Sequence, residues 1–261
     1  MLEGKRILLT GVATDDSIAL AVGRRAQQLG AEIIAAVFPR DREVAAEALA
    51  SLPKPPVAIV DADLTDPAHL DHLTAELRAT WNGLDGALHA VAFAPKTALE
   101  GPFLDTPSRD VELAFRTSAH SYAGLAGVLA ELAPRAGGSL VGLDFDGAVA
   151  WPVYNWMGVC KSALESVNRY VARDLGSSRI RSNLVAAGPL HTRAADAIPG
   201  FHRLLDAWEE QAPLTWVPTD PEPVADAVCF LLSDFGRAVT GEILHVDGGF
   251  HATATRLATG S

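Results

Sequence analysis

The chain has 261 residues, which suits one α/β domain with a single large core. Apolar residues make up 49% and charged residues 20%, as is ordinary for a soluble globular protein. The net charge of −11 argues against a nucleic-acid surface, because phosphate contacts require clustered Lys and Arg. The N-terminal stretch 1–6 shows no signal peptide, and no apolar run reaches membrane-span length. We therefore expect a cytoplasmic protein that binds neither nucleic acid nor membrane.

The cysteines and histidines suggest no metal centre. Cys160 and Cys229 have neither CxxC nor metal-ligand spacing, so we expect two small buried hydrophobes rather than a disulfide or a zinc site. The eight histidines form no recognisable ligand set, and no metal is expected. His191 is expected to be a loop residue rather than a catalytic base.

Short apolar runs alternate with helical patterns along the chain. Strands are expected at 6–10, 31–38, 57–60, 84–93, 138–143, 182–187 and 242–246. Helices are expected at 18–30, 42–52, 67–81, 110–132, 154–175 and 221–232. The Pro-interrupted segment 188–216 is expected to hold one or two more. The alternation predicts an α/β fold, a single Rossmann-type doubly wound domain over residues 1–261 with a seven-stranded parallel sheet flanked by helices.

The end of the first strand has the order of a dinucleotide-binding turn. Gly11 follows the strand, and a helical pattern begins at Ser17 and Ile18, although GxGxxG is absent. Gly11 lets the backbone turn, and free N–H groups at the helix start can hold a pyrophosphate, with Ser17 as a cap or donor. The alternative is a plain turn capped by Asp16 or Ser17.

Two further strand ends offer groups for an adenosine. Phe38 can lie against an adenine, and Arg40 and Arg42 can read a 2′-phosphate, which keeps NADPH open beside NADH. The alternative is a core Phe with two solvated arginines. Asp63, followed by Leu64, can accept a hydrogen bond from the adenine amino group, although Asp is also ordinary in turns.

The sixth strand ends at Gly188-Pro189, at the sheet edge where open α/β sheets bind ligands. Thr192 is placed to reach a phosphate. Tyr154 and Lys161 are seven residues apart on a predicted helix, on one face about two turns apart. A nearby cation favours the phenolate, so the pair suits a reaction in which negative charge appears on a substrate oxygen. A buried Tyr with a snorkelling Lys is the alternative.

Together these features resemble the NADH-dependent enoyl-acyl-carrier-protein reductases of the extended-motif short-chain dehydrogenase/reductase family, in particular the actinobacterial and mycobacterial form. The Tyr–Lys gap of seven carries most of the resemblance, because carbonyl-reducing members of the superfamily have a gap of four and a catalytic Ser after the fifth strand. Residues 141–147 contain no Ser. The other motifs cover nearly the whole chain: Gly11 with 17–19, 143–146, 154–157 with 161–165, 181–189, and 240–241 with 247–249.

The resemblance implies reduction of a trans-2-enoyl thioester, bound to acyl carrier protein or coenzyme A, in fatty acid biosynthesis. Tyr154 is implied to bind the thioester carbonyl oxygen, Lys161 the nicotinamide ribose, and Phe145 with Met157 the substrate. The segment 188–216 is implied to cover the acyl pocket, and the assembly to be a homotetramer. The implied cofactor contacts are Gly11, Val12, Ser17, Ile18, Phe38, Asp63, Leu64, Val91, Ala92, Lys161, Gly188, Pro189, Leu190 and Thr192.

Three departures from the family pattern lead to expectations of their own. Ala92 stands where the family usually has Gly, so the backbone beside the cofactor is expected to shift. Asp15 and Asp16 are expected to weaken cofactor binding if both face the phosphates. The segment after Thr192 is shorter than in the mycobacterial members, which predicts a preference for shorter acyl chains or a more open pocket.

Two other functions remain open at this point. One is a carbonyl-reducing member of the same superfamily in secondary metabolism, against which the missing Ser and the gap of seven argue. The other is a non-catalytic dinucleotide-binding regulator, against which the intact Tyr154 and Lys161 argue.

Overall fold

Seven parallel strands form one sheet in the computed structural model, which describes residues 1–254. Their order is β3-β2-β1-β4-β5-β6-β7, so β1 lies between β2 and β4 and the chain changes direction across the sheet there. This confirms the predicted Rossmann-type, doubly wound α/β fold. The strands are β1 (Arg6–Thr10), β2 (Glu32–Val37), β3 (Ala58–Asp61), β4 (Gly86–His89), β5 (Gly138–Asp144), β6 (Ile180–Ala187) and β7 (Ile243–Val246).

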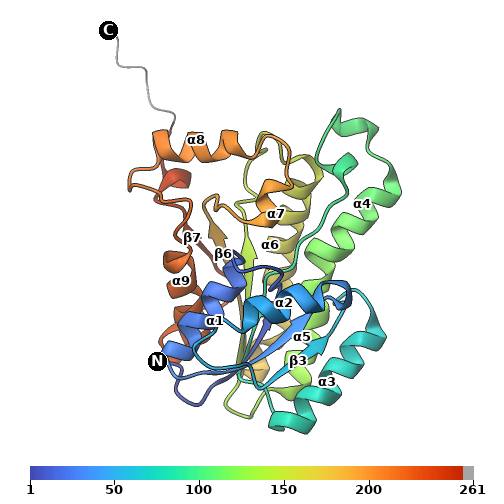
Figure 1. Cartoon of the computed structure of the whole chain (residues 1–261), viewed down its shortest axis with the longest axis vertical. Helices are drawn as coiled ribbons and strands as arrows, with labels where there is room; N and C mark the ends of the chain where they lie inside the picture. The colour runs from blue at the N-terminus through green and yellow to red at the C-terminus, as the bar shows by residue number, and fades with distance from the viewer. Residues whose placement is uncertain (255–261) are drawn as a thin grey trace.

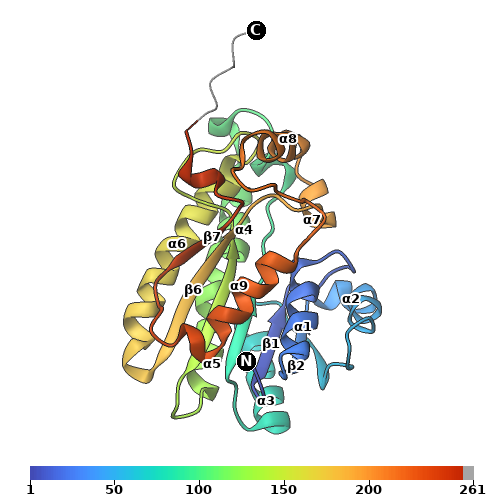
Figure 2. The ribbon, with the colours of Figure 1, turned by 90° about the vertical axis from the view of Figure 1, so that its left-hand side faces the viewer.

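Helices cover both faces of the sheet (Figures 1 and 2). The α-helices are α1 (Ile18–Gln28), α2 (Arg42–Leu49), α3 (Pro67–Trp81), α4 (Ser108–Phe115), α5 (Ser121–Leu132), α6 (Asn155–Leu175), α7 (Arg193–Asp196), α8 (His202–Gln211) and α9 (Glu222–Leu232). Short 3₁₀ turns occur at Pro39–Asp41, Lys96–Ala98, Phe103–Asp105, Gly176–Ser178, Asp234–Gly236 and Phe250–Ala252.

Two hydrophobic cores hold these layers together. One packs α1, α2 and α9 against one face of the sheet, and the other packs α3, α5 and α6 against the opposite face. In β1, Ile7 and Leu9 belong to the first core and Leu8 to the second. Successive side chains therefore point to opposite buried faces, which is why the strands read as continuous apolar runs rather than as alternating ones.

The fourth strand is shorter than the predicted 84–93, because side chains take over the backbone hydrogen bonds beyond His89. The Thr10 hydroxyl accepts the N–H of Ala90 at 3.3 Å. The Ser118 hydroxyl accepts the N–H of Phe93 and donates to its carbonyl, both at 2.9 Å. The chain therefore leaves the ladder early and lines the carboxyl edge of the sheet.

The predicted helix 110–132 is instead two helices joined by a π-helical turn. The turn spans Arg116–His120, between α4 and α5. It supplies Ser118, which holds the chain after β4, so the irregularity lies beside the sheet edge where ligands bind.

Several other predictions concern the chain as a whole. Cys160 and Cys229 are buried free thiols, as predicted. No helix within residues 1–254 is both long enough and apolar enough to cross a bilayer. The predicted single domain included residues 255–261, which lie outside the described residues.

Candidate active site

Gly11 turns the chain at the carboxyl end of β1, where no side chain fits. Its φ is +83°, and a Cβ would lie 2.1 Å from the carbonyl oxygen of Ala90. Ser17 closes the turn, since its hydroxyl accepts the N–H groups of Ala13 at 3.1 Å and Thr14 at 2.9 Å. Ser17 is the N-cap residue of α1, as the alternative expected, but its hydroxyl bonds the preceding loop and not the helix.

The start of α1 is left open for an anion. No side chain of the described residues caps this helix, and its first turn contains no acidic residue. The first N–H groups of a helix have no intrahelical partner, and the helix dipole makes this end positive. The Gly11 turn and the start of α1, with Ile18 as its first residue, therefore form an arrangement that suits a pyrophosphate.

A cavity of about 350 Å³ opens beside this turn. Seven of the expected cofactor residues line it: Gly11, Val12, Phe38, Asp63, Leu64, Val91 and Ala92. Phe38 is 44% exposed, so the interpretation of a core Phe is wrong. A ring open to the cavity suits an adenine, and the Gly11 turn in the cavity wall leads on to the start of α1.

The adenosine end contains an acidic residue that the sequence analysis missed. Arg42 is committed to Asp61, with 2.7 Å between Nη1 and Oδ1. Arg40 lies over the Phe38 ring at 5.4 Å and lines the cavity together with Asp41. A carboxylate accepts ribose hydroxyls and repels a 2′-phosphate, so this wall favours NADH. The signal was an acid three residues after Phe38, not directly at the strand end.

Asp63 is placed as expected at the edge of this cavity. Its Oδ1 accepts both the N–H and the hydroxyl of Thr65 at 2.8 Å, as in an Asx turn. Within residues 1–254, Oδ2 has no hydrogen-bond partner and is available to an adenine amino group. The turn and the ligand can therefore use different oxygens of one carboxylate.

The remaining expected cofactor residues do not line this cavity. The chain leaves β6 through Gly188, where a Cβ would lie 2.8 Å from both the Trp208 Nε1 and the Trp216 ring. Trp216 Nε1 donates to the Pro189 carbonyl at 2.7 Å, and Leu190 is buried. Two indoles thus pack on the segment that follows the sheet.

The segment after Leu190 is tied to the turn that follows β1. Thr192 caps α7 by accepting the N–H of Ala195 at 3.1 Å, and within residues 1–254 its O–H donates to no other group. Asp16 accepts the N–H of Arg193 at 2.6 Å and also the Thr14 hydroxyl. Asp16 is therefore a tether between two loops. Ala194 lines the cavity, which brings this segment to the cofactor side.

Tyr154 precedes α6 by one residue, so its predicted place on the helix is wrong by that residue. The backbone on either side is unusual: φ is +60° at Val153 and +38° at Asn155. Positive φ at a β-branched residue is an outlier, and such strain clusters at functional sites. The chain thereby fixes the direction of the phenol.

An aromatic cluster surrounds Tyr154. Phe145 follows β5 and lies 5.0 Å from the Tyr154 ring, 5.1 Å from Trp151 and 5.6 Å from Trp208. Trp208 stacks on Phe250 at 3.7 Å between ring centroids. Since Trp208 belongs to α8, the predicted substrate segment meets Phe145, which in turn packs on Tyr154. The sequence analysis identified neither tryptophan.

Three site residues share one buried region. Tyr154, Phe145 and Met157 are each no more than 7% exposed and belong to the same core cluster. Lys161 is also buried; its Nζ donates to the Leu143 carbonyl at 3.0 Å and lies 3.9 Å from Asp144 Oδ1. Phe145 and Tyr154 are therefore in contact, and Lys161 lies near the end of β5, next to the segment that contains Phe145.

The electrostatics of this region differ from the prediction. Burial raises the pKa of Tyr154 above its ordinary value, and the Asp144 carboxylate raises it further. Lys161 was expected to favour the phenolate, and that expectation is wrong here because burial dominates. The pKa of Lys161 itself is lowered by burial, against the opposing charge of Asp144.

Comparison with known proteins now decides the family. The family described as Enoyl-(Acyl carrier protein) reductase matches residues 11–251. The chain belongs to this family. An enoyl-acyl-carrier-protein reductase (NADH) from Mycolicibacterium smegmatis is 45% identical over 266 residues, covering 95% of this chain and 97% of the relative. The enzyme of the same name from Mycobacterium avium is 41% identical, with 95% and 97% covered.

This reductase family also includes more distant relatives of the chain. The enoyl-acyl-carrier-protein reductase (NADH) FabI from Bacillus subtilis is 37% identical, covering 97% of this chain and 98% of the relative. These similarities confirm the resemblance inferred from the Tyr–Lys gap and the strand-end motifs.

Proposed function

We propose that this protein is an NADH-dependent enoyl-acyl-carrier-protein reductase of fatty acid biosynthesis. The observation that carries the proposal is Tyr154, held by strained backbone against Phe145 at the sheet edge that also forms the dinucleotide cavity. Family membership over residues 11–251 and the relatives named as NADH enzymes support it.

Each residue of the buried region has a role in this reaction. When bound, NADH would supply the hydride for Cβ of a trans-2-enoyl thioester, and a proton from water would complete the reduction at Cα. Tyr154 donates a hydrogen bond to the thioester carbonyl oxygen, where negative charge grows. Because burial raises its pKa, the phenol stays protonated and remains a donor at neutral pH. Lys161 holds the nicotinamide ribose hydroxyls, and Phe145 and Met157 contact the acyl chain.

The other expected cofactor residues take their roles from their positions. The Gly11 turn, with Val12, Ser17 and Ile18, holds the pyrophosphate. Phe38, Asp63 and Leu64 hold the adenosine, and Val91 and Ala92 line the same cavity just after the end of β4. The residues after β6 that close over the cofactor are Gly188, Pro189, Leu190 and Thr192.

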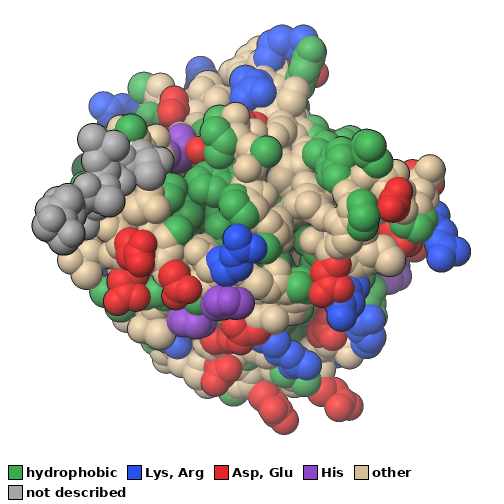
Figure 3. Space-filling view, turned by 90° about the horizontal axis from the view of Figure 1, so that it is seen from above, with side chains coloured by type: hydrophobic (Ala, Val, Ile, Leu, Met, Phe, Trp, Pro, Cys, Tyr) green, Lys and Arg blue, Asp and Glu red, His purple; other side chains and the backbone are tan. Residues whose placement is uncertain are grey.

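The proposed substrate is an enoyl chain carried by acyl carrier protein, in the cytoplasm, with coenzyme A thioesters as the alternative carrier. The carrier approaches the carboxyl edge, since Tyr154 and the Trp208 helix lie there. Figure 3 looks onto this edge and shows hydrophobic side chains in patches, with charged side chains of both signs between them. Such a mixed surface suits a weak, transient partner.

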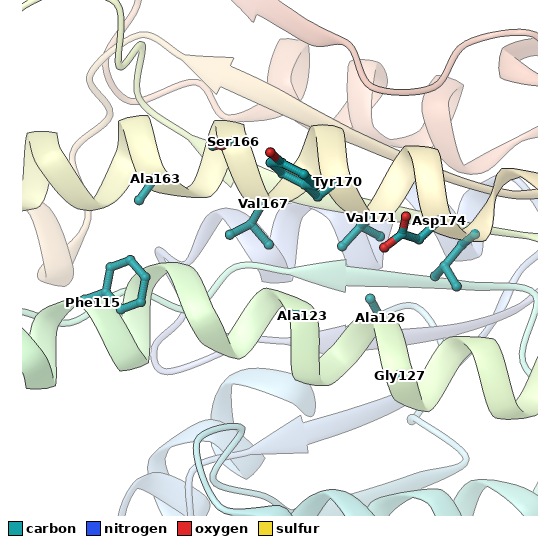
Figure 4. A pocket seen from close by; sticks show the side chains of 11 residues that line it. Phe115, Ala123, Ala126, Gly127, Ala163, Ser166, Val167, Tyr170, Val171 and Asp174 are labelled. Carbon is teal, nitrogen blue, oxygen red and sulfur yellow. The ribbon is translucent and has the colours of Figure 1, made fainter.

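The proposed assembly is a homotetramer. A groove of about 670 Å³ between α5 and α6 supports this proposal (Figure 4). Small and apolar residues line it, including Ala126, Gly127, Ala163 and Val167, and the exposed ring of Tyr170 lies at its rim. Small residues allow close approach, so a second copy can pack its own two helices here.

Light scattering after size exclusion tests the assembly. A Cβ at Gly127 would meet no atom within 4 Å, so Gly127→Arg alters the groove without a clash inside the protomer. We expect the variant to have a smaller mass than wild type, while Glu47→Arg on the exposed face of α2 keeps the wild-type mass. Equal masses for all three proteins would contradict an interface at this groove.

One assay tests the activity. NADH oxidation is followed with dodecenoyl and crotonyl thioesters and with a ketoacyl thioester, in wild type and Tyr154→Phe. We expect turnover of the enoyl substrates only, and loss of turnover in Tyr154→Phe. Turnover of the ketone alone would identify a carbonyl reductase, and NADH binding without any turnover would identify a regulator.

A further inference from the structure

The end of β5 contains a carboxylate that receives no hydrogen bond of good geometry within residues 1–254, although the backbone N–H of Phe145 lies near enough to favour its charged form. Asp144 is 5% exposed, and neither of its side-chain oxygens has a hydrogen-bond partner within residues 1–254. Buried polar groups are nearly always hydrogen-bonded, so this one requires an explanation. Its nearest opposite charge is Lys161, whose Nζ lies 3.9 Å from Oδ1, with the side chains 8% and 0% exposed for Lys161 and Asp144.

We propose that Asp144 is a positioning residue that keeps the Lys161 ammonium charged and aimed at the nicotinamide ribose. The inference rests on the proposed function, since that function gives Lys161 its role. The Lys161 ammonium has three N–H donors, one of which goes to the Leu143 carbonyl at 3.0 Å. Asp144 attracts the ammonium electrostatically but does not take one of its N–H groups in a hydrogen bond. Two of the three N–H groups therefore remain to donate to two ribose hydroxyls.

The charges around Asp144 and Lys161 favour this arrangement, in which Asp144 supplies the counter-charge and the ammonium keeps two N–H donors. Burial raises the pKa of Asp144 to about 7, against the Lys161 charge, and the Glu165 carboxylate raises it further. Burial together with the Lys161 charge lowers the pKa of His89 to about 3, so this imidazole stays neutral. The titratable groups facing the pair are Glu165 and Cys160 on α6, Tyr154 before it, Asp146 after β5, His89 on β4 and Tyr122 on α5.

Removing the carboxylate would leave a buried ammonium without a counter-charge. Burial already lowers the pKa of Lys161, and the Asp144 carboxylate is the charge that opposes this shift most strongly. Without Asp144 the ammonium loses its proton at a lower pH. A neutral amine binds the ribose hydroxyls less firmly, so the loss of NADH affinity at alkaline pH must begin earlier.

The test is the affinity of the free enzyme for NADH between pH 6 and 10, measured by NADH fluorescence in wild type and Asp144→Asn. In wild type, NADH affinity should fall above the pH at which Lys161 loses its proton; we call this fall the alkaline limb. In Asp144→Asn we expect the alkaline limb to begin at least one pH unit lower. At the pH where wild type begins to lose binding, the Kd of the variant should then be about tenfold weaker. Below pH 7 the two proteins should bind NADH alike. Asp144→Glu should restore the wild-type limb.

Asp146→Asn is the matched control, because it removes a carboxylate two residues away that bonds the N–H of Ala148 and lies 3.9 Å from His245. We expect its alkaline limb to match wild type. A limb that stays in place in Asp144→Asn, or an equal loss of affinity at every pH, would overturn the inference, since an equal loss is what a merely structural role predicts.

A second measurement uses the wild-type protein alone, so it does not depend on whether a variant folds. In the wild-type enzyme without NADH, the ¹³C signal of the Lys161 ε-carbon should report two titration steps, one from its own ammonium and one from Asp144. A single step would overturn the coupling. Neither measurement uses an enoyl thioester, so failure of the proposed reaction and failure of this inference are distinguishable.

Discussion

Gly11→Ala tests whether the turn after β1 shapes the cofactor site. Gly11 has φ +83°, a conformation that costs an L-residue about 1–2 kcal/mol. The new Cβ would lie 2.1 Å from the Ala90 oxygen and 2.6 Å from its carbonyl carbon, both backbone atoms. Ordinary contact begins at 3.4 Å, so the turn and the chain after β4 must separate by more than 1 Å. Overpacking of this kind adds about 1–3 kcal/mol.

We therefore expect Gly11→Ala to lower the free energy of unfolding by about 2–5 kcal/mol in urea titrations. We also expect the Kd for NADH to rise by about ten- to a hundredfold, since a shift of this size spoils the N–H groups aimed at the pyrophosphate and costs about 1.4–2.8 kcal/mol. Isothermal titration calorimetry with NADH measures this.

Gly4→Ala separates backbone strain from the clash. Gly4 has φ +68°, but a Cβ there would meet no atom within 4 Å. It should cost only the conformational part, about 1–2 kcal/mol, and leave NADH affinity unchanged. If Gly11→Ala costs no more than Gly4→Ala, or binds NADH as tightly as wild type, the reasoning about this turn is refuted.

Three further outcomes are expected. Tyr154→Phe should lower kcat by roughly 10²–10³ with the Kd for NADH within about twofold of wild type, measured by steady-state NADH oxidation and fluorescence binding; unchanged kcat would exclude the oxyanion role. Rates on C8 to C16 enoyl thioesters should favour the shorter chains because of the short segment after Thr192, and an optimum at the longest chain would contradict this. The pKa of Asp144 is raised from 3.8 to about 7 in the folded state, so the folded protein holds more protons in that range and loses stability as the pH rises through it. In urea unfolding, the stability of wild type relative to Asp144→Asn should therefore fall between about pH 4 and 7, by at most about 4 kcal/mol, and a difference independent of pH would refute it.

The sheet could be predicted because its strands are buried on both faces. Continuous runs such as Ile7 to Leu9 have no other stable place in a soluble domain, and each expected strand is found. Where an element boundary was predicted wrongly, side chains from distant parts of the chain determine it. The end of β4 depends on Ser118, which arrives from a π-helical turn 25 residues later. The pattern of apolar residues within a strand contains no information about such a contact.

The candidate site was predictable to a similar degree. The strand-end positions of Gly11, Phe38 and Asp63 follow from the rule that ligands bind at the carboxyl edge, and these residues do line one cavity. The raised pKa of Tyr154 was not predictable, because it depends on burial of a side chain that packs on Phe145 and on the nearby Asp144 carboxylate. These contacts join the end of β5 to the start of α6, and no local spacing encodes them.

The end of β5 links the chemistry of this site to its reaction. Carbonyl-reducing members of the superfamily place a serine hydroxyl there, which can donate to a substrate oxygen. This chain has Asp144, and an ionised carboxylate only accepts hydrogen bonds. Above its raised pKa of about 7, the Asp144 carboxylate would repel an oxygen that gains negative charge, and its nearest positive charge is the Lys161 ammonium, 3.9 Å away. In the proposed reaction the side-chain donor to the thioester oxygen is therefore Tyr154, and Asp144 acts on the cation that holds the ribose. The gap of seven residues and the absent serine then belong to one arrangement. In it, Tyr154 donates to the thioester oxygen, and Lys161 binds the ribose hydroxyls.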